Sequence, residues 1–137
     1  MFCKTNFSNR KVIKVKYLAI CENHLYSKAY KKGKRVVTPT IAVYVLPDYR
    51  KRALMKANPI KEYVNRVGLT VGKKIGGAVE RNRAKRIIRH AYKNIDTESK
   101  IKCGNLIVIV AREGIAGKKT GDVQREMRRA LKKLELI

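Results

Sequence analysis

Residues 72–93 join a glycine-rich turn to a predicted helix that is apolar on one side and basic on the other. At about 100° per residue, four apolar residues fall on one stripe, namely Ala84, Ile87, Ile88 and Ala91. The opposite side repeats this spacing with polar and basic residues and is widened by two further cations: Asn82, Arg86, Arg89 and Lys93, with Arg81 and Lys85. Cations fixed on a packed helix can match a specific array of phosphates, which is the chemistry of a nucleic-acid binder.

A basic helix side is more often a solvated surface than a binding site. Solvated helices, however, usually mix Glu with Lys at i,i+4 spacing, whereas this helix carries no acid between Glu80 and Lys93. Clustered arginines repel one another unless a polyanion compensates them. The pattern therefore favours binding over simple solvation.

The glycines before the helix allow a tight turn from a strand into a helix, whatever the function. Gly77 near the start of the helix predicts backbone N–H groups that no side chain caps, and such groups bind phosphate. Lys73 and Lys74 stand beside this end. The glycine spacing matches neither of the common nucleotide-binding loops, so no nucleotide cofactor is supported.

Three tyrosines admit two interpretations. Tyr26 and Tyr30 are i,i+4 neighbours on an expected helix, and Tyr44 lies in an expected strand. They could be half-buried core residues, or they could form a stacking surface for single-stranded bases. Spacing alone does not decide between the two.

The sequence predicts no catalytic residue and no metal site in the protein. The ten acidic residues are scattered, so no paired carboxylates are available for metal-dependent or acid–base chemistry. Cys21 and His24 have a ligand-like spacing, but a zinc site needs about four ligands. Nothing clusters Cys3, Cys103 or His90 with them.

Charge and hydropathy define the class of protein. The 137 residues include 34 Lys and Arg against 10 Asp and Glu, a net charge of +24, which indicates a polyanionic partner. Basic amphipathic helices also bind lipid surfaces, but this helix lacks the apolar edge that such binding requires. No segment has the length of a transmembrane span or the apolar core of a signal peptide. We expect a cytoplasmic protein that binds nucleic acid and no membrane.

The expected elements fit one α+β domain. In chain order they are a helix at 22–32, strand segments within 36–46, a solvated connection at 48–65 with a helical turn or two, a strand at 66–72, a helix at 78–94, a strand at 102–112 and a helix from Thr120 as N-cap. Residues 1–19 are expected to form a basic arm before the domain at 20–137. The order is α-β-β-β-α-β-α.

Residues 74–89 resemble the Arg-Asn-Arg signature of the bacterial ribonuclease P protein subunit. Residues 29–34, 42–46 and 106–112 resemble the end of that family's first helix, its next strand and the strand after the signature helix. The resemblance extends over about residues 20–135. Departures are the longer segments 1–19 and 48–65, and Lys73 and His90 where other residue types are usual.

The resemblance implies a ribosomal-protein-like α/β sandwich with an unusual left-handed β-α-β crossover. It also implies a function in tRNA 5′ maturation: an endonuclease, ribonuclease P, removes the 5′ leader of precursor tRNA. The implied chemistry is hydrolysis by the partner RNA with bound Mg²⁺. The protein would bind that catalytic RNA and the leader, with no protein partner required.

Site residues follow by position in the signature. The resemblance implies that the catalytic RNA contacts Lys74, Arg81, Arg83, Lys85, Arg86 and Arg89, and the basic pattern of the turn and helix adds Lys73 and Lys93 to this set. It implies that the leader contacts Tyr26, Tyr30, Tyr44, Arg81 and Asn82. For the tyrosines, it favours stacking over the core interpretation.

Two other functions remain as alternatives. A basic ribosomal protein or assembly factor would bind ribosomal RNA without changing precursor tRNA cleavage. A metal-dependent nuclease would need an indispensable acid, such as Asp96 or Glu98, and would cleave without RNA.

Overall fold

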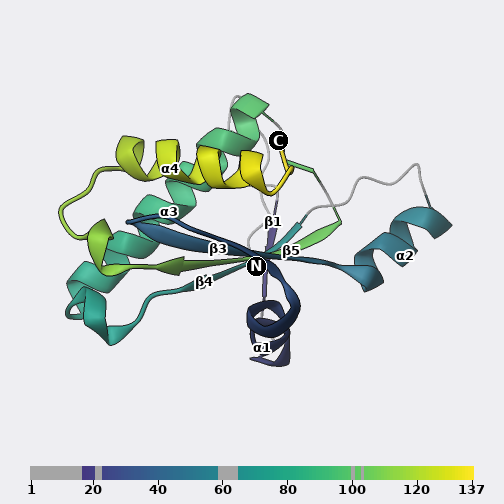
Figure 1. The fold of residues 1–137 in the computed structure, drawn as a ribbon, viewed down its shortest axis with the longest axis horizontal. Coiled ribbons are helices and arrows are strands. Elements are labelled where there is room, and N and C mark those ends of the chain that lie inside the picture. Colours follow the sequence, from purple (N-terminus) through teal and green to yellow (C-terminus); the bar gives the residue numbers. More distant parts are fainter. Residues whose placement is uncertain (1–16, 21–22, 59–64, 100, 103) are drawn as a thin grey trace, which may run out of the picture.

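The chain forms a five-stranded mixed sheet with helices on both faces (Figure 1). The computed structural model describes residues 17–20, 23–58, 65–99, 101–102 and 104–137. The strands are β1 (Tyr17–Ala19), β2 (Lys34–Val37), β3 (Ile41–Pro47), β4 (Asn65–Thr70) and β5 (Asn105–Ala111), in the spatial order β1-β4-β5-β3-β2. The helices are α1 (Asn23–Lys32), α2 (Tyr49–Ala57), α3 (Ala78–Ser99) and α4 (Thr120–Lys133), with short 3₁₀ turns at Lys73–Ile75 and Glu113–Ile115.

Alternation along β3 creates two cores. Because successive side chains of a strand point to opposite faces, Ile41, Val43 and Val45 join the large core under α3 and α4. Leu46 joins the smaller core under α1, with Ala29 of that helix and Val108 of β5. Figure 1 shows α3 and α4 above the sheet and α1 below it.

The apolar stripe predicted for the helix at 78–94, which is α3 in the structure, is buried. Ala84, Ile87, Ile88 and Ala91 are at most 7 % exposed and belong to the large core. The helix runs five residues beyond the predicted end at 94, because Tyr92 and Ile95 continue the buried stripe. Its opposite side is thereby turned to solvent.

Helix α4 begins one residue away from its predicted cap. Lys119, and not Thr120, is the N-cap residue, since its backbone N–H donates to the Asp122 carboxylate at 3.2 Å. That hydrogen bond, helped by the charges of Arg125 and Lys118, lowers the pKa of Asp122. The predicted apolar face of α4 is confirmed, because Val123, Met127, Ala130, Leu131 and Leu134 are all buried.

The structure corrects the predicted element order at two points. The arm predicted at 1–19 contains strand β1, whose residues Tyr17–Ala19 pair in parallel with Asn65–Val67 of β4; residues 1–16 lie outside the described part. The connection at 48–65 contains a full helix, α2, and ends in the first residue of β4. Adjacent parallel strands β4 and β5 are joined through α3, and the left hand of that crossover stays a prediction.

Candidate RNA interface

The residues predicted to contact catalytic RNA lie together on the 3₁₀ turn at Lys73–Ile75 and on the solvent side of α3. We call this set the signature face: Lys73, Lys74, Arg81, Arg83, Lys85, Arg86, Arg89 and Lys93. Five members are exposed, Arg86 and Arg89 among them, and Arg81, Lys85 and Lys93 are half-buried. The structure therefore presents these cations on one rigid support.

Two arginines of the signature face make contacts within the protein. The Arg83 guanidinium donates to the carbonyl oxygen of Lys118 at 2.9 Å, which joins α3 to the loop before α4. Arg81 Nε donates to the carbonyl oxygen of Gly77 at 3.4 Å. The side chains of Arg86 and Arg89 make no ion pair or hydrogen bond within the described residues. These two are the cations most available to phosphate.

The start of α3 differs from the sequence expectation. The backbone N–H of Gly77 is not free, because it donates to Glu80 Oε1 at 2.8 Å. A carboxylate at this position satisfies one N–H group and complements the helix dipole, as in a capping box. It also places negative charge where the sequence predicted a phosphate. We therefore expect phosphate to bind the side chains of the signature face and not the backbone N–H groups at the start of α3.

We expect Glu80→Gln to strengthen RNA binding by a small factor, about two- to fivefold, at low salt. The amide keeps an oxygen that can accept the Gly77 N–H, while one negative charge next to the signature face is removed. Affinity for ribonuclease P RNA should be compared between wild type and variant at two salt concentrations. The gain should shrink at high salt, and a weaker affinity for the variant would contradict this interpretation.

The three tyrosines do not play equal parts. Tyr26 is half buried, its hydroxyl donates to the Ile20 carbonyl at 3.4 Å, and its ring covers Gly68 of β4. A Cβ at position 68 would lie 2.6 Å from the tyrosine hydroxyl, so only glycine fits beneath the ring. Tyr26 thus packs against the smaller core, with only part of its ring exposed.

Tyr30 and Tyr44 form an open aromatic corner. Their ring centroids are 5.0 Å apart with an interplanar angle of 75°, an edge-to-face arrangement. The Tyr30 hydroxyl and Thr70 Oγ1 lie 3.1 Å apart in a hydrogen bond, and Tyr30 is 41 % exposed. We call Tyr26, Tyr30, Tyr44 and Thr70 the tyrosine face. It presents aromatic surface beside α1 and can stack with bases.

Sequence reasoning missed two residues near this surface. Register places Arg35 of β2 opposite Tyr44, and it places Thr70 at the same side of the sheet as Tyr44. Both depend on strand pairing, which no local pattern reveals. Asn82, predicted to contact the leader, is exposed on α3, and no described hydrogen bond joins it or Arg81 to the tyrosines.

The acids proposed for a metal-dependent nuclease have structural contacts. Asp96 Oδ1 accepts the backbone N–H of Ile101 at 3.1 Å, and Glu98 pairs with Arg128 of α4. Among the described residues, no group of three His, Cys, Asp or Glu side chains could hold a metal ion, and Cys3, Cys21 and Cys103 fall outside those residues. The described residues therefore do not fit a protein-bound metal ion. Within the same part of the chain, no helix is long and apolar enough to cross a bilayer.

Comparison with known proteins identifies the family. Residues 16–135 match the family described as Ribonuclease P. The chain belongs to the ribonuclease P protein family. The Ribonuclease P protein component of Clostridium acetobutylicum is 30 % identical over 118 residues, covering 86 % of this chain and 89 % of that protein. The component of Clostridium perfringens strain 13 is 33 % identical over 119 residues, covering 87 % and 90 %.

Solved structures agree with the family assignment. The RNase P protein of Staphylococcus aureus has a TM-score of 0.66 and 29 % identity, over 86 % of this chain and 95 % of that one. The RNase P protein of Thermotoga maritima, at 22 % identity and a TM-score of 0.60, shares the fold over 79 % of this chain and 89 % of that one. The mixed α+β fold expected from the sequence is thus confirmed as that of ribonuclease P proteins.

Proposed function

We propose that this chain is the protein subunit of ribonuclease P and has no catalytic site of its own. Its signature face binds the catalytic RNA, and its tyrosine face binds the 5′ leader of precursor tRNA. The observation that carries the proposal is the row of cations from Arg81 to Lys93, with no acid among them, on the solvent side of a helix whose other side packs in the core, in a chain that belongs to the ribonuclease P protein family.

The electrostatics of the signature face suit an RNA ligand. Each arginine can make a charge-assisted, bidentate contact with phosphate, and release of counterions from the RNA makes such binding depend steeply on salt. A helix packed through six buried residues holds those cations without further loss of conformational freedom. The helix therefore supplies pre-organised charge.

The tyrosine face suits a single strand. An unpaired leader exposes the flat faces of its bases, and aromatic side chains bind such faces with little regard to sequence. The rings of Tyr30 and Tyr44 are inclined at 75°, so one ring can stack on the face of a base while the other contacts the edge of that base. Binding the leader raises the affinity for precursor over mature tRNA, which favours product release.

The chemistry itself belongs to RNA in this proposal. Mg²⁺ held by the RNA and substrate would activate the water for phosphodiester hydrolysis. The protein contributes by bringing catalytic RNA and leader together and by neutralising their phosphates. A cytoplasmic place of action, without a further protein partner, is part of the proposal.

The test is precursor tRNA cleavage at low Mg²⁺ with a ribonuclease P RNA, with this protein, and with both. We expect accurate cleavage at the mature 5′ end from the mixture only. Cleavage by the protein alone would point to a nuclease, and RNA binding without stimulation would point to a ribosomal-type binding protein. Either result would refute the proposal.

A further inference from the structure

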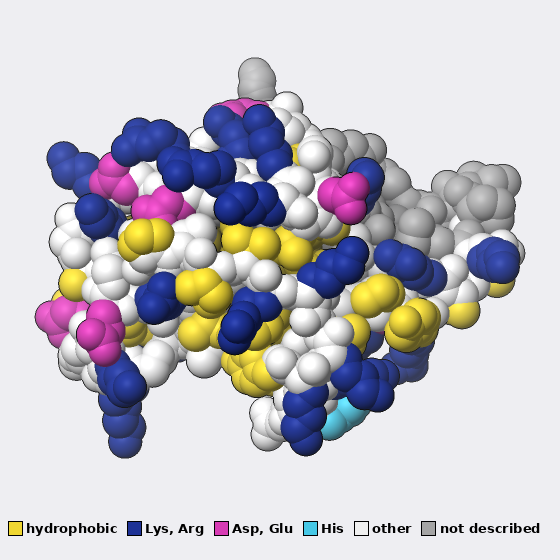
Figure 2. All heavy atoms as spheres, in the orientation of Figure 1, with side chains coloured by type: hydrophobic (Ala, Val, Ile, Leu, Met, Phe, Trp, Pro, Cys, Tyr) yellow, Lys and Arg dark blue, Asp and Glu magenta, His cyan; other side chains and the backbone are white. Residues whose placement is uncertain are grey.

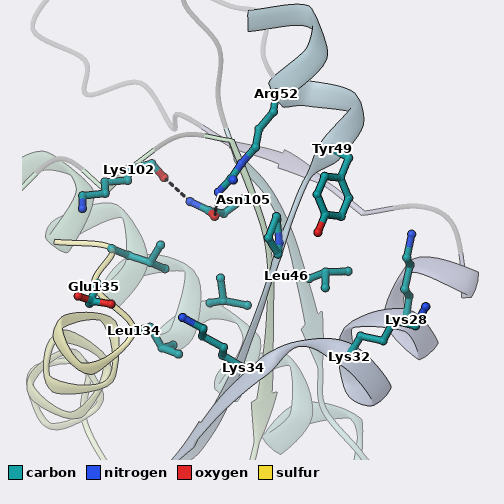
Figure 3. A pocket seen from close by; sticks show the side chains of 13 residues that line it. Lys28, Lys32, Lys34, Leu46, Tyr49, Arg52, Lys102, Asn105, Leu134 and Glu135 are labelled. Carbon is teal, nitrogen blue, oxygen red and sulfur yellow. Dashed lines mark hydrogen bonds between the residues drawn. The ribbon is translucent and has the colours of Figure 1, made fainter. Parts of the chain in front are cut away.

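A second basic surface lies on the flank of α1 that faces away from the tyrosine face. At about 100° per residue, positions 28 and 32 lie roughly 200° around the helix from positions 26 and 30. Lys28 and Lys32 line a cavity of about 580 Å³ that extends from α1 and α2, around the ends of β2 and β3, to the start of β5 and the residues that follow α4 (Figure 3). A neighbouring cavity of about 170 Å³ shares Lys28 and the ring of Tyr49 with it. We call the two together the α1–α2 groove.

The groove carries positive charge with few acids to offset it. Lys28, Lys32 and Lys34 line the larger cavity, and Arg50 lines the smaller one. These four side chains are exposed and make no ion pair or hydrogen bond within the described residues. Of the acids that line the two cavities, Asp48 is engaged with Arg66, and only Glu135 stands at the wall of the larger cavity.

The α2 side of the groove is firmly anchored. Asp48, directly before α2, is 4 % exposed and accepts two hydrogen bonds from the Arg66 guanidinium of β4, at 2.8 and 3.0 Å. Arg52 donates to the Gly104 carbonyl at 3.0 Å and to Asn105 Oδ1 at 3.3 Å. These contacts hold the first turn of α2 against the end of the sheet, although the rest of that helix projects outward (Figure 1).

Tyr49 gives the groove an aromatic side chain. It is 65 % exposed, which is unusual for a large ring next to an anchored helix start. Figure 3 shows its hydroxyl directed into the cavity near Leu46, with Lys28 and Lys32 on the same side of β3 and Lys34 across that strand. Figure 2 shows hydrophobic and basic side chains next to one another where α1 and α2 approach. An exposed ring among unpaired cations is the composition of a site for single-stranded nucleic acid.

We propose that the α1–α2 groove binds a single-stranded segment of the large partner RNA, as a contact separate from the signature face and the tyrosine face. The phosphates lie at Lys28 and Lys32, and a base lies against Tyr49. This inference rests on the proposed function, because it takes the partner to be ribonuclease P RNA.

The place of the groove selects the large RNA over the leader. A leader seated on the tyrosine face would have to cross α1, a cylinder about 10 Å wide with its side chains, to enter the groove. A large folded RNA that holds the signature face can present another of its segments there. A second contact with the same RNA adds to the affinity, because its binding becomes intramolecular.

The test compares Lys28→Ala/Lys32→Ala with a control that removes the same charge, Lys31→Ala/Lys133→Ala. All four lysines are exposed helix residues, and the control pair lines neither cavity. Affinity for ribonuclease P RNA should be titrated over a series of salt concentrations. We expect a roughly tenfold loss for the groove variant and a salt slope shallower by about two units. Control and Lys28→Arg/Lys32→Arg should stay close to wild type.

A second experiment shows whether the groove binds the catalytic RNA or the leader of precursor tRNA. The KM for precursor tRNA should be measured with a full leader and without one, using saturating catalytic RNA. We expect the ratio of these KM values to be unchanged in the groove variant. A ratio that moves assigns the groove to the leader and overturns the proposal, as does RNA binding equal to the control.

Tyr49→Ala should weaken RNA affinity about fivefold or more, while Tyr49→Phe keeps it. Equal RNA affinity of Tyr49→Ala and wild type would show that Tyr49 does not contact a base. If wild-type protein binds no ribonuclease P RNA, the proposed function and this inference fail together. If wild type binds and stimulates cleavage while groove and control variants behave alike, only this inference fails.

Discussion

Replacing Arg86 and Arg89 with alanine is expected to weaken binding to ribonuclease P RNA about 100-fold and to leave the fold intact. A hydrogen bond to a charged group contributes about 1.5–3 kcal/mol, so two lost contacts amount to about 3 kcal/mol, or two powers of ten. Both side chains are exposed and lack partners within the described residues, so their removal costs the fold little.

The measurement is a titration of the RNA at several salt concentrations, beside circular dichroism and a melting curve. The log–log slope should become shallower by about two units, one for each lost phosphate contact. Arg129→Ala/Lys132→Ala on the exposed side of α4 is the matched control. Unfolding of the Arg86/Arg89 variant would assign these residues a structural role, and an unchanged slope would exclude phosphate contact.

Replacing Tyr30 with alanine is expected to raise the KM for leader-bearing precursor tRNA about tenfold, with no change for a leaderless substrate. Stacking of a base on an aromatic ring contributes about 1–3 kcal/mol. Tyr30 is the more exposed ring of the corner, and its loss also leaves Tyr44 without its edge-to-face partner. Tyr44→Ala should therefore act in the same direction.

Phenylalanine variants provide the control for the tyrosine face. Tyr30→Phe keeps the ring and loses only the exposed hydrogen bond to Thr70, so its KM should stay within about twofold of wild type. Tyr26 is unsuited to this test, because its ring packs over Gly68 within the smaller core. Equal losses for leader-bearing and leaderless substrates in Tyr30→Ala would show that the tyrosine supports the fold or the RNA contact instead.

Periodicity predicted the parts of the fold that local burial determines. The 3.6-residue period predicted the buried stripe of α3 through Ala84 and Ile88 and the buried face of α4 through Met127. The spacing of the apolar residues along an amphipathic helix is enough to show which side is buried. The function and the type of α/β sandwich were predicted from the family resemblance and not from periodicity. Exposure of Arg86 and Arg89 followed from the same periodicity.

The features that the sequence missed depend on distant partners. Strand β1 is three residues long and gains its backbone pairing from β4, more than forty positions away. The side chains of helix α2 that the structure describes are all exposed, and the helix is fixed through Asp48–Arg66 and through Arg52, contacts that span 18 to 53 positions. The hydrogen bond from the Gly77 N–H to the Glu80 carboxylate could not be predicted, because it depends on the geometry of the turn before α3. Tyr26 and Tyr30 look equivalent by spacing, and only Gly68 beneath one ring separates their roles.

The strand order also has a consequence for how the chain folds. The β2–β3 hairpin can form early from neighbouring residues, whereas β5, the last strand to be synthesised, lies between β3 and β4 in the finished sheet. Until residue 111 has left the ribosome, the inner edges of β3 and β4 have no partner, and the helix that follows β4 has no complete surface to pack on. Because the central pairings join segments far apart in sequence, they form slowly compared with local contacts. The nascent chain, already strongly basic, therefore carries unpaired strand edges until almost all of it has been made.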